Sequence, residues 1–463
     1  MPTATDTECR DPGRTWDGPA VALLDGGSRG TVRVLGGPGT GKTSLLVDIA
    51  VARIAGGADP QSVLLLTGSG RLSTQARAGL TVRLLSTGEH GQHPPVVRQP
   101  LLRSLHSYAF AVLRLAAERA GDPPPRLITG AEQDGTIREL LAGDLEDGAT
   151  YWPAPLRAAL GTAGFATELR DLMARCTERG VDASQLRRLG RLHKRPEWVA
   201  AGRFAEQYEQ VMLLRSSVGM AAPQATVPAF GAAELVGAAL DALAADPELL
   251  AGERARISTL LVDDAQHLDP QAAQLVRVLA AGVDSAIIAG DPNQAVFGFR
   301  GADPALLTAS DAPAVQLERS YRCAPAIARA ISGVAGLLPG HGPARVISGS
   351  AADTDADEGS VSVQLAASER AEVNLIADTL RRAHLLDGVP WAQMAVVVRS
   401  VSRAAVALPR VLSAAGVPVA APTVSAPLAD NAVVHAMLTV LAATADGLTG
   451  EHALELVTGP IGR

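Results

Sequence analysis

The stretch Gly36-Gly37-Pro38-Gly39-Thr40-Gly41-Lys42-Thr43 decides how the rest of this chain is interpreted. Every specified position matches the pattern Gly-x-x-x-x-Gly-Lys-Ser/Thr, the phosphate-binding P-loop. Glycines let the backbone turn tightly and direct several N–H groups at one anion, and a helix beginning near Thr43 adds the positive end of its dipole. Lys42 is therefore expected to bind the β and γ phosphates of a nucleotide, and the Thr43 hydroxyl to hold Mg²⁺.

The residues on either side of the loop indicate a strand before it and a helix after it. Residues 31–35 (TVRVL) form an apolar, β-prone run, and residues 44–50 (SLLVDIA) are helical in character, with a glycine pair at Gly56-Gly57 to end the helix. The alternative is a glycine-rich turn that matches by chance. Composition argues against chance, because Lys42 is one of only two lysines in the chain, which has 41 Lys and Arg residues. In a chain that uses arginine at nearly every other basic position, the compact ammonium group of Lys42 is found at the position where a phosphate is expected.

Length and composition limit the class of protein. A chain of 463 residues should hold about two to four domains, and 47% hydrophobic with 19% charged residues is globular. The sequence shows no membrane-length apolar run and no signal peptide, and its three scattered cysteines, Cys9, Cys176 and Cys323, form neither a disulfide framework nor a zinc cluster. We therefore expect a cytoplasmic protein without a membrane partner. The net charge of −7 argues against coating of nucleic acid over the whole surface, but a local basic groove is compatible with it.

Strand-like and helix-like stretches alternate along much of the chain. The expected strands are residues 31–35, 62–67, 101–105, 259–263 and 285–291. The stretch 121–252 interrupts this alternation with mostly helical periodicity. The pattern predicts an α/β fold, in which residues 1–120 and 253–325 form a parallel sheet covered on both faces and 121–252 form a helical insertion. A second α/β pattern within 326–463 is expected from residues 361–365, 369–384, 395–399 and 404–414.

A pair of carboxylates follows the expected strand at 259–263. Asp263 and Asp264 lie at its carboxyl end, shortly before Gln266. In a P-loop protein the first carboxylate is expected to bind the Mg²⁺ shell, and the second to orient or deprotonate the attacking water. On its own, an acidic pair at such a place is more often a helix cap or a solvated loop. Beside a P-loop it becomes a candidate catalytic site.

The stretch 290–302 (GDPNQAVFGFRGA) is a third element with chemical character. Phe297 and Phe299, two of only six phenylalanines, lie two residues apart beside Arg300. Packing in a core is the ordinary role of phenylalanine. Flanked by glycines and an arginine, however, the two rings resemble a platform on which nucleic-acid bases stack, an interaction worth about 1–3 kcal/mol per base.

Taken together, these stretches resemble the motifs of the UvrD/Rep/PcrA-like superfamily 1 DNA helicases. Residues 263–267 (DDAQH) are similar to the D-E-x-Q motif, and 290–302 to G-D-x-x-Q-x-I-Y-x-[FW]-R-G-A. Residues 317–323 (LERSYRC) are similar to the N-Y-R-S motif, and the order along the chain is that of the family. The resemblance implies a RecA-like ATP-binding domain 1A at 1–120 with 253–325. It further implies a 1B-type insertion at 121–252 and an incomplete second motor domain 2A, with or without the start of 2B, at 326–463.

The resemblance also implies roles for individual residues. Gln266 and Gln294 would sense the γ-phosphate, Tyr321 would stack on adenine, and Arg322 would neutralise charge in the transition state. The implied catalytic residues are Lys42, Asp263, Asp264, Gln294 and Arg322, and the implied Mg²⁺ ligands are Thr43 and Asp263. The residues expected along single-stranded DNA are Thr67, Ser69, His106, Phe297, Phe299 and Arg300. ATP and Mg²⁺ are the implied cofactors.

Within the family, the chain most resembles the AdnA-type subunit of the bacterial AdnAB helicase–nuclease. That resemblance rests on the amino-acid sequences of three stretches, residues 34–42, 263–267 and 290–294. It implies translocation from 3′ to 5′ on single-stranded DNA during double-strand-break repair and recombination. It also implies a heterodimeric helicase–nuclease partner subunit.

Three departures from the family pattern are visible. Asp264 stands where the helicases usually have Glu, so the carboxylate is one methylene shorter and slow hydrolysis is expected. No Gln precedes Gln61, so the glutamine that contacts adenine in the family is missing. The sequence ends at Arg463 before motif V, motif VI or a nuclease motif, as expected of an N-terminal portion or of a subunit unable to work alone.

Two functions of different kinds remain open at this point. The chain is either part of an ATP-driven motor, or a catalytically weak nucleotide-dependent DNA clamp or structural partner subunit. An unrelated P-loop protein such as a small-molecule kinase is a weaker third alternative, because it explains neither the aromatic pair at Phe297 and Phe299 nor the Tyr321-Arg322 stretch.

Overall fold

The chain forms two compact units, Met1–Val361 and Ser362–Arg463. The computed structural model describes residues 16, 18–68, 70–87, 102–217, 229–339, 342–349, 358–420, 431–460 and 462.

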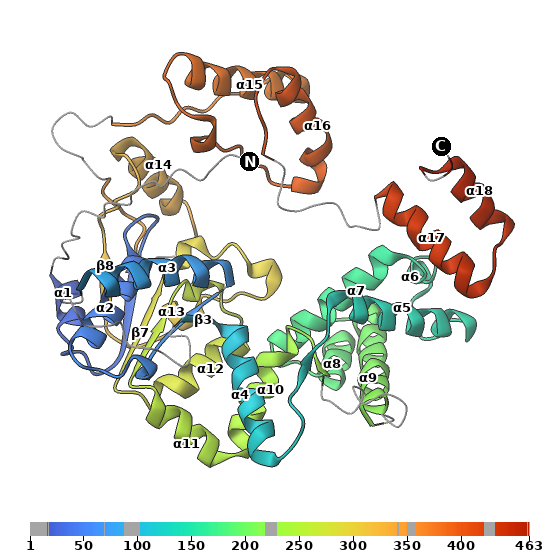
Figure 1. The fold of residues 1–463 in the computed structure, drawn as a ribbon, viewed down its shortest axis with the longest axis horizontal. Coiled ribbons are helices and arrows are strands. Elements are labelled where there is room, and N and C mark those ends of the chain that lie inside the picture. The colour runs from blue at the N-terminus through green and yellow to red at the C-terminus, as the bar shows by residue number, and fades with distance from the viewer. Residues whose placement is uncertain are drawn as a thin grey trace. The chain divides into compact units, whose positions relative to one another are not determined.

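A six-stranded parallel sheet in the order β3-β2-β6-β7-β1-β8 forms the centre of the first unit (Figure 1). Its strands are β1 (Gly30–Gly36), β2 (Val63–Thr67), β3 (Leu102–Ser104), β6 (Thr259–Val262), β7 (Ser285–Gly290) and β8 (Ala314–Leu317). β1 pairs with β7 from Gly30 with Ser285 onward, and with β8 from Arg33 with Ala314 onward. The predicted α/β class and the five expected strands of this unit are confirmed. The sequence did not predict β8, because its four residues (AVQL) are partly exposed and form no apolar run.

Alternate side chains of the strands enter two separate cores, one on each face of the sheet. Leu64, Leu260 and Ile288 belong to one core, whereas Leu65 and Ile287 belong to the other. The first core includes α4 (Leu105–Ala120), α10 (Glu234–Ala245), α11 (Pro247–Arg256) and α12 (Pro270–Ala280). The second includes α1 (Pro19–Leu24), α2 (Lys42–Ala55) and α3 (Gly70–Thr87). Burial of both faces is the expected arrangement for a parallel sheet, and it brings the carboxyl ends of its strands to one edge.

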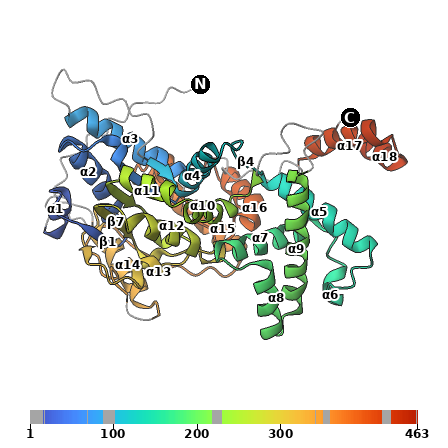
Figure 2. The same ribbon diagram turned by 90° about the horizontal axis from the view of Figure 1, so that it is seen from below.

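A cluster of helices between α4 and α10 has a third core of its own. Its helices are α5 (Gly130–Glu146), α6 (Ala154–Arg157), α7 (Ala163–Glu178), α8 (Ala183–Leu192) and α9 (Pro196–Ser217). Trp152 is only 2% exposed, with Phe165 edge-on and Phe204 tilted against its ring. The cluster lies to one side of the sheet in both views (Figures 1 and 2). A two-residue parallel pair, β4 (Arg126–Leu127) with β5 (Ala229–Phe230), joins the chain entering the cluster to the chain leaving it.

The first unit extends past the residue at which the sequence predicts domain 1A to end, 325. After α13 (Ala305–Thr308) and α14 (Pro325–Gly336), the segment 342–349 returns toward the P-loop side of the unit. The Ser348 N–H donates to the Glu318 carbonyl at 2.8 Å, and the Ser320 N–H donates to the Ser348 carbonyl at 2.8 Å. These bonds hold the segment 342–349 to the stretch around Ser320 within the first unit. The expected domain boundary at 325/326 stays a prediction.

The second unit contains four described helices: α15 (Glu369–Leu385), α16 (Val401–Ala414), α17 (Ala432–Asp446) and α18 (Gly450–Thr458). α15 and α16 confirm the helices expected at 369–384 and 404–414. The strands expected at 361–365 and 395–399 are wrong, because these residues pair with no strand in the described part of the chain. Val363 is 89% and Val397 is 93% exposed. An apolar, β-prone run becomes a strand only when another strand satisfies its backbone.

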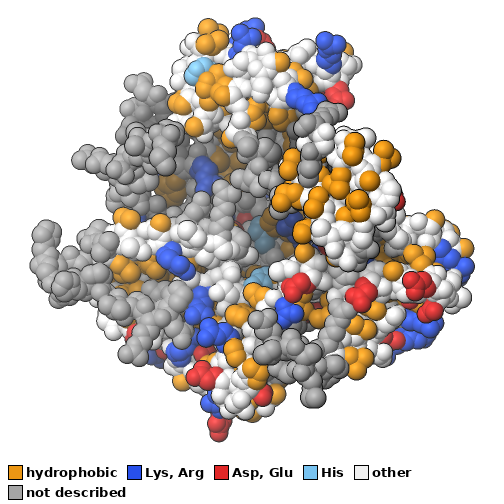
Figure 3. Space-filling model, turned by 45° about the vertical axis from the view of Figure 1, so that its right-hand side comes forward, with side chains coloured by type: hydrophobic (Ala, Val, Ile, Leu, Met, Phe, Trp, Pro, Cys, Tyr) orange, Lys and Arg blue, Asp and Glu red, His pale blue; other side chains and the backbone are white. Residues whose placement is uncertain are grey.

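α17 and α18 pack on each other and leave apolar side chains exposed. Met437, Leu441, Leu454 and Val457 are each more than half exposed, and hydrophobic side chains are visible on the surface in Figure 3. Among the described helices of both units, none combines the length and the apolar character that crossing a membrane requires.

Candidate nucleotide and DNA site

The P-loop connects the end of β1 to the beginning of α2, as its flanking residues predict. Gly39 and Gly41 have φ angles of 73° and 91°, in the left-handed region that favours glycine. Neighbours also leave no room for larger residues: a Cβ on Gly39 would lie 2.6 Å from the Ser320 Oγ, and a Cβ on Gly37 would lie 2.5 Å from Ile347 Cγ2. The loop is therefore a backbone cradle of the kind that fits phosphate groups.

Lys42 lies at the mouth of this cradle. Its Nζ donates hydrogen bonds to the carbonyls of Gly36 at 2.7 Å and Gly37 at 3.0 Å. Burial lowers the pKa of Lys42, while the nearby carboxylates Asp291 and Asp264 oppose that shift. Phosphate oxygens can replace these two carbonyl oxygens as acceptors of the hydrogen bonds from Nζ. The position of the ammonium group therefore fits the predicted phosphate ligand.

Thr43 and Asp263 meet across the loop. The Thr43 Oγ1 donates to Asp263 Oδ2 at 2.6 Å. Asp263 directly follows β6 and is 2% exposed; burial and the adjacent charge of Asp264 raise its pKa to about 6. A hydroxyl and a buried carboxylate are hard oxygen ligands of the kind that Mg²⁺ prefers. Bound here, the cation would neutralise charge on the phosphates, and Thr43 with Asp263 would hold it.

A chain of hydrogen bonds runs from the carboxylate pair to the end of β7. Gln266 donates through Nε2 to Asp264 Oδ1 at 3.1 Å, and its Oε1 accepts the Asp291 N–H at 3.0 Å. Asp291 in turn accepts from Gln294 Nε2 at 2.7 Å through Oδ2. The structure thus brings together the predicted residues Asp264, Gln266 and Gln294. Asp291 joins the two glutamines. No role was expected for it, although it occupies the Asp position of the G-D-x-x-Q stretch.

The stretch around Tyr321 is held directly to the P-loop. Ser320 is fully buried, and its hydroxyl donates to the Pro38 carbonyl at 2.8 Å. The Tyr321 N–H donates to the Gly39 carbonyl at 2.8 Å, and a Cβ on Gly39 would lie 2.5 Å from the Arg322 Cβ. Tyr321 and Arg322 are therefore beside the loop, as the family resemblance implies. Ser320 was missed, because a serine between charged and aromatic residues carries no pattern of its own.

Phe297 and Phe299 are 39% and 73% exposed, so core packing does not explain them. Their ring centroids are 6.2 Å apart, and the Arg300 guanidinium lies 5.8 Å from one ring and 5.5 Å from the other. They lie at η4 (Gly298–Arg300), just after η3 (Pro292–Gln294), the turn that carries Gln294. This aromatic loop presents ring faces and a cation, the groups that bind single-stranded nucleic acid.

The other residues expected along DNA differ in position. His106 is exposed in the first turn of α4. Thr67 is only 2% exposed, and its hydroxyl is hydrogen-bonded to that of Ser73 in α3. This hydrogen bond stabilises the turn from β2 into α3. A side chain buried in this way does not support the predicted direct contact between Thr67 and DNA. Ser69 lies outside the described residues.

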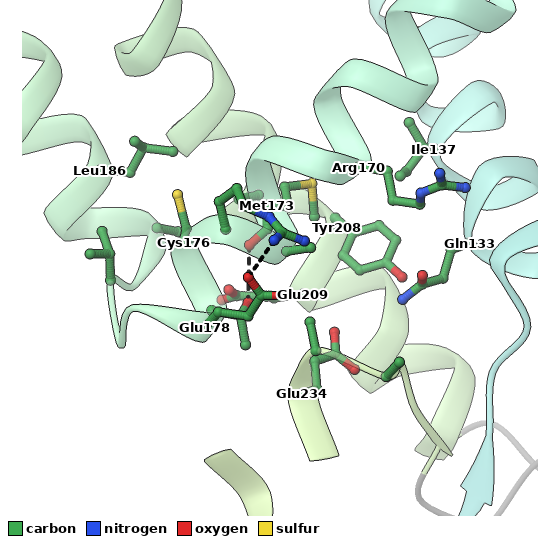
Figure 4. Close-up of a pocket in the computed structure, with 18 residues that line it drawn as sticks. Gln133, Ile137, Arg170, Met173, Cys176, Glu178, Leu186, Tyr208, Glu209 and Glu234 are labelled. Atoms are coloured by element: carbon green, nitrogen blue, oxygen red, sulfur yellow. Dashed lines mark hydrogen bonds and ion pairs between the residues drawn. The ribbon is translucent and has the colours of Figure 1, made fainter. Parts of the chain in front are cut away.

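The helix cluster touches the aromatic loop through the end of α7. Arg175 and Glu178 form an ion pair of 2.7 Å and line a cavity of about 220 Å³ between α5, α7, α8 and α9 (Figure 4). A Cβ on Gly301 would collide with the Glu178 carboxylate. Burial raises the pKa of Glu178 to about 7. Gly301, whose φ is 82°, therefore suits both the turn and this close approach.

A parallel sheet with a P-loop after its β1 strand and carboxylates after β6 defines a P-loop nucleoside-triphosphatase domain. Residues 21–313 match the UvrD/REP helicase N-terminal domain. The chain belongs to the UvrD/REP helicase family, which confirms the resemblance at family level; its members are ATP-hydrolysing DNA helicases. The chain is also similar to the Bacillus subtilis (strain 168) protein named "Putative ATP-dependent DNA helicase YjcD", with 23% identity over 281 residues. The match covers 60% of this chain and 32% of that relative, so the chain spans about a third of its length.

Proposed function

We propose that this chain is the ATP-binding portion of a DNA helicase or translocase that moves along single-stranded DNA from 3′ to 5′. Lys42 binds the β and γ phosphates, and Thr43 with Asp263 holds Mg²⁺. Asp264 orients the attacking water, Arg322 stabilises charge in the transition state, and Tyr321 contacts the base.

One observation carries the proposal. The hydrogen-bond chain from Asp264 through Gln266 and Asp291 reaches Gln294, and the aromatic loop begins three residues later. A change in phosphate occupancy at the P-loop therefore alters contacts that lead directly to Phe297 and Phe299. Coupling of this kind between a nucleotide site and a stacking surface is what a motor requires, and a small-molecule kinase has no use for it.

The resemblance to AdnA-type subunits extends the proposal to a cellular role. We place the chain in the resection of double-strand breaks and in recombination, as one subunit of a heterodimeric helicase–nuclease in the cytoplasm. The stretches that support this are residues 34–42, 263–267 and 290–294, two of which belong to the hydrogen-bond chain described above.

The short side chain of Asp264 and its hydrogen bond favour a second function. Its carboxylate is shorter than the usual Glu, and its Oδ1 already accepts a hydrogen bond from Gln266. A group so engaged holds the attacking water less well. The second candidate is therefore a nucleotide-dependent DNA clamp or structural partner subunit, which binds ATP and DNA but hydrolyses slowly.

ATP hydrolysis with and without single-stranded DNA separates the two functions. The purified chain and its Lys42→Ala variant, as the blank, are measured with Mg²⁺ and ATP. Hydrolysis that depends on Lys42 and rises with DNA supports the motor. Binding of ATP and DNA without turnover supports the clamp. Turnover that is unchanged in Lys42→Ala contradicts both, because the P-loop would then have no part in it.

A further inference from the structure

The indole of Trp16, which precedes α1, lies directly against the P-loop. Its Cη2 atom is 2.9 Å from the position that a Cβ on Gly41 would occupy. Trp16 is also packed at the edge of the core that contains α2 and remains partly exposed. We propose that this ring is a stacking wall for the base of the bound nucleotide, and that the site accepts purine nucleoside triphosphates with little distinction between adenine and guanine. This inference rests on the proposed nucleotide binding.

The geometry of the loop places the nucleoside near Trp16. In a P-loop the N–H groups at the start of the helix bind the α and β phosphates, while the lysine and the metal-binding carboxylate mark the γ end. Here the γ end is at Lys42 and Asp263. Ile347 covers the loop at Gly37, and Ser320 covers it at Gly39. The sugar and base therefore leave the loop at its helix end, beside Gly41, and Trp16 adds a second contact to the one proposed for Tyr321.

Two helices fix the orientation of the indole. Its Nε1–H donates to Asp48 Oδ2 in α2 at 2.8 Å. Asp48 is 8% exposed, and its other oxygen is paired with Arg83 of α3. A ring held in this way loses little conformational freedom when a base stacks on it.

The same hydrogen bond decides what the ring can recognise. Indole has one polar hydrogen and no acceptor, and Asp48 takes that hydrogen. Trp16 therefore offers only its aromatic surface and cannot distinguish the exocyclic groups of the bases. No Gln precedes Gln61 to supply an amide that would do so. Stacking area then favours purines over pyrimidines, with ATP and GTP bound alike.

Equilibrium binding with Mg²⁺ tests the inference, using ATP, GTP, CTP and inorganic tripolyphosphate as probes. The wild-type chain should bind ATP and GTP within about threefold of each other and CTP roughly tenfold more weakly, as expected for loss of stacking area. Trp16→Ala should weaken ATP and GTP about tenfold and leave tripolyphosphate unchanged. Trp16→Phe should retain most of the affinity. Trp198→Phe, a partly buried tryptophan in the helix cluster, is the matched control.

Each contrary result overturns the inference in a different way. Equal losses for ATP and tripolyphosphate in Trp16→Ala would mean that the ring only braces the loop. Unchanged ATP binding would mean that it does not touch the base, and a strong preference of the wild type for ATP over GTP would mean that another group recognises adenine. If the wild type binds neither ATP nor tripolyphosphate, the proposed function fails instead.

Fluorescence keeps the test independent of whether Trp16→Ala folds. The chain has four tryptophans, and ATP should quench a component of their emission that Trp16→Phe removes and Trp198→Phe preserves. Tripolyphosphate should not quench it. Equal quenching by ATP in wild type and Trp16→Phe would contradict stacking on Trp16.

Discussion

The imidazole of His267 lies edge-on against the ring of Phe297, with 4.7 Å between the ring centroids. His267 ends η2 (Ala265–His267), the short turn that also carries Gln266. A single turn after the carboxylate pair therefore contacts both the hydrogen-bond chain to β7 and the aromatic loop.

Replacing His267 by Ala should weaken the coupling between DNA and hydrolysis. Contacts between aromatic rings are worth about 0.5–1.5 kcal/mol, so the DNA concentration for half-maximal stimulation should rise roughly three- to tenfold. His267→Phe, which keeps a ring against Phe297, should restore the stimulation. ATPase titrations with single-stranded DNA measure both variants, and identical titration curves for wild type and His267→Ala would remove His267 from the coupling.

Truncating Phe299 to Ala should weaken binding of single-stranded DNA about tenfold, because one base loses its stacking partner. Nucleotide affinity should stay nearly unchanged, since the ring is 73% exposed on the aromatic loop. Fluorescence anisotropy with a labelled oligonucleotide gives the DNA affinity. Val296→Ala in the same loop, also exposed but without a ring, is the control. Equal DNA affinity in wild type and Phe299→Ala would show that the bases stack elsewhere.

Lengthening Asp264 to Glu should raise the turnover number if the short carboxylate limits hydrolysis. An added methylene lets the group bond Gln266 and still reach the attacking water. We expect a gain of roughly tenfold, less than the ~10²–10⁴-fold of a whole general base, because Asp264 already supplies a carboxylate. The backbone at Asp264 has a φ of 52°, which Asp tolerates better than Glu, so thermal unfolding of the variant is measured alongside. A folded variant with unchanged turnover would show that carboxylate length is not limiting.

Asp263 should make stability depend on pH. Burial raises its pKa to about 6 from the ordinary value of 3.8, so the folded chain binds this proton more tightly than the unfolded chain. Its contribution to the free energy of unfolding therefore falls as pH rises from about 4 to about 6, and stays low above that.

The Asp263→Asn variant tests this dependence. Without Mg²⁺ it should be more stable than wild type at pH 7.5, by roughly 2–3 kcal/mol, and the difference should shrink at pH 4.5. Urea unfolding at the two pH values measures it. A difference that is the same at both pH values would mean that Asp263 is not protonated in this range. With Mg²⁺ and ATP, the wild type should gain more stability than the variant, because an amide is a poorer Mg²⁺ ligand than a carboxylate.

Local sequence was enough to predict the strand and helix around the P-loop and the strand before the carboxylate pair, whereas contacts between distant segments were not predictable. The P-loop and the Asp263-Asp264 pair are each contained in a few residues whose types fix their chemistry. Ser320 and Trp16 contact the P-loop from other parts of the chain. The residues next to them in the sequence give no indication of this contact. Thr67 differs from these residues, because the family resemblance implies a contact with DNA, whereas its hydroxyl is buried against α3.

Two of the expected strands do not form, because no neighbouring strand pairs with them in the described part of the chain. Residues 361–365 and 395–399 have the apolar, β-prone composition of strands, yet composition cannot supply the neighbouring backbone that a ladder requires. β8 shows the opposite case, because its pairing with β1 makes a strand of four residues that have little apolar character.

β1 lies between β7 and β8, although it is made long before either of them. A chain emerging from the ribosome therefore carries an apolar strand whose two edges stay open until the whole helix cluster has been synthesised. Closure of such long-range pairs is slow, and open strand edges aggregate. We expect nascent chains that end before β7 to depend on chaperones, and the P-loop to reach its final shape only after Ser320 has been made.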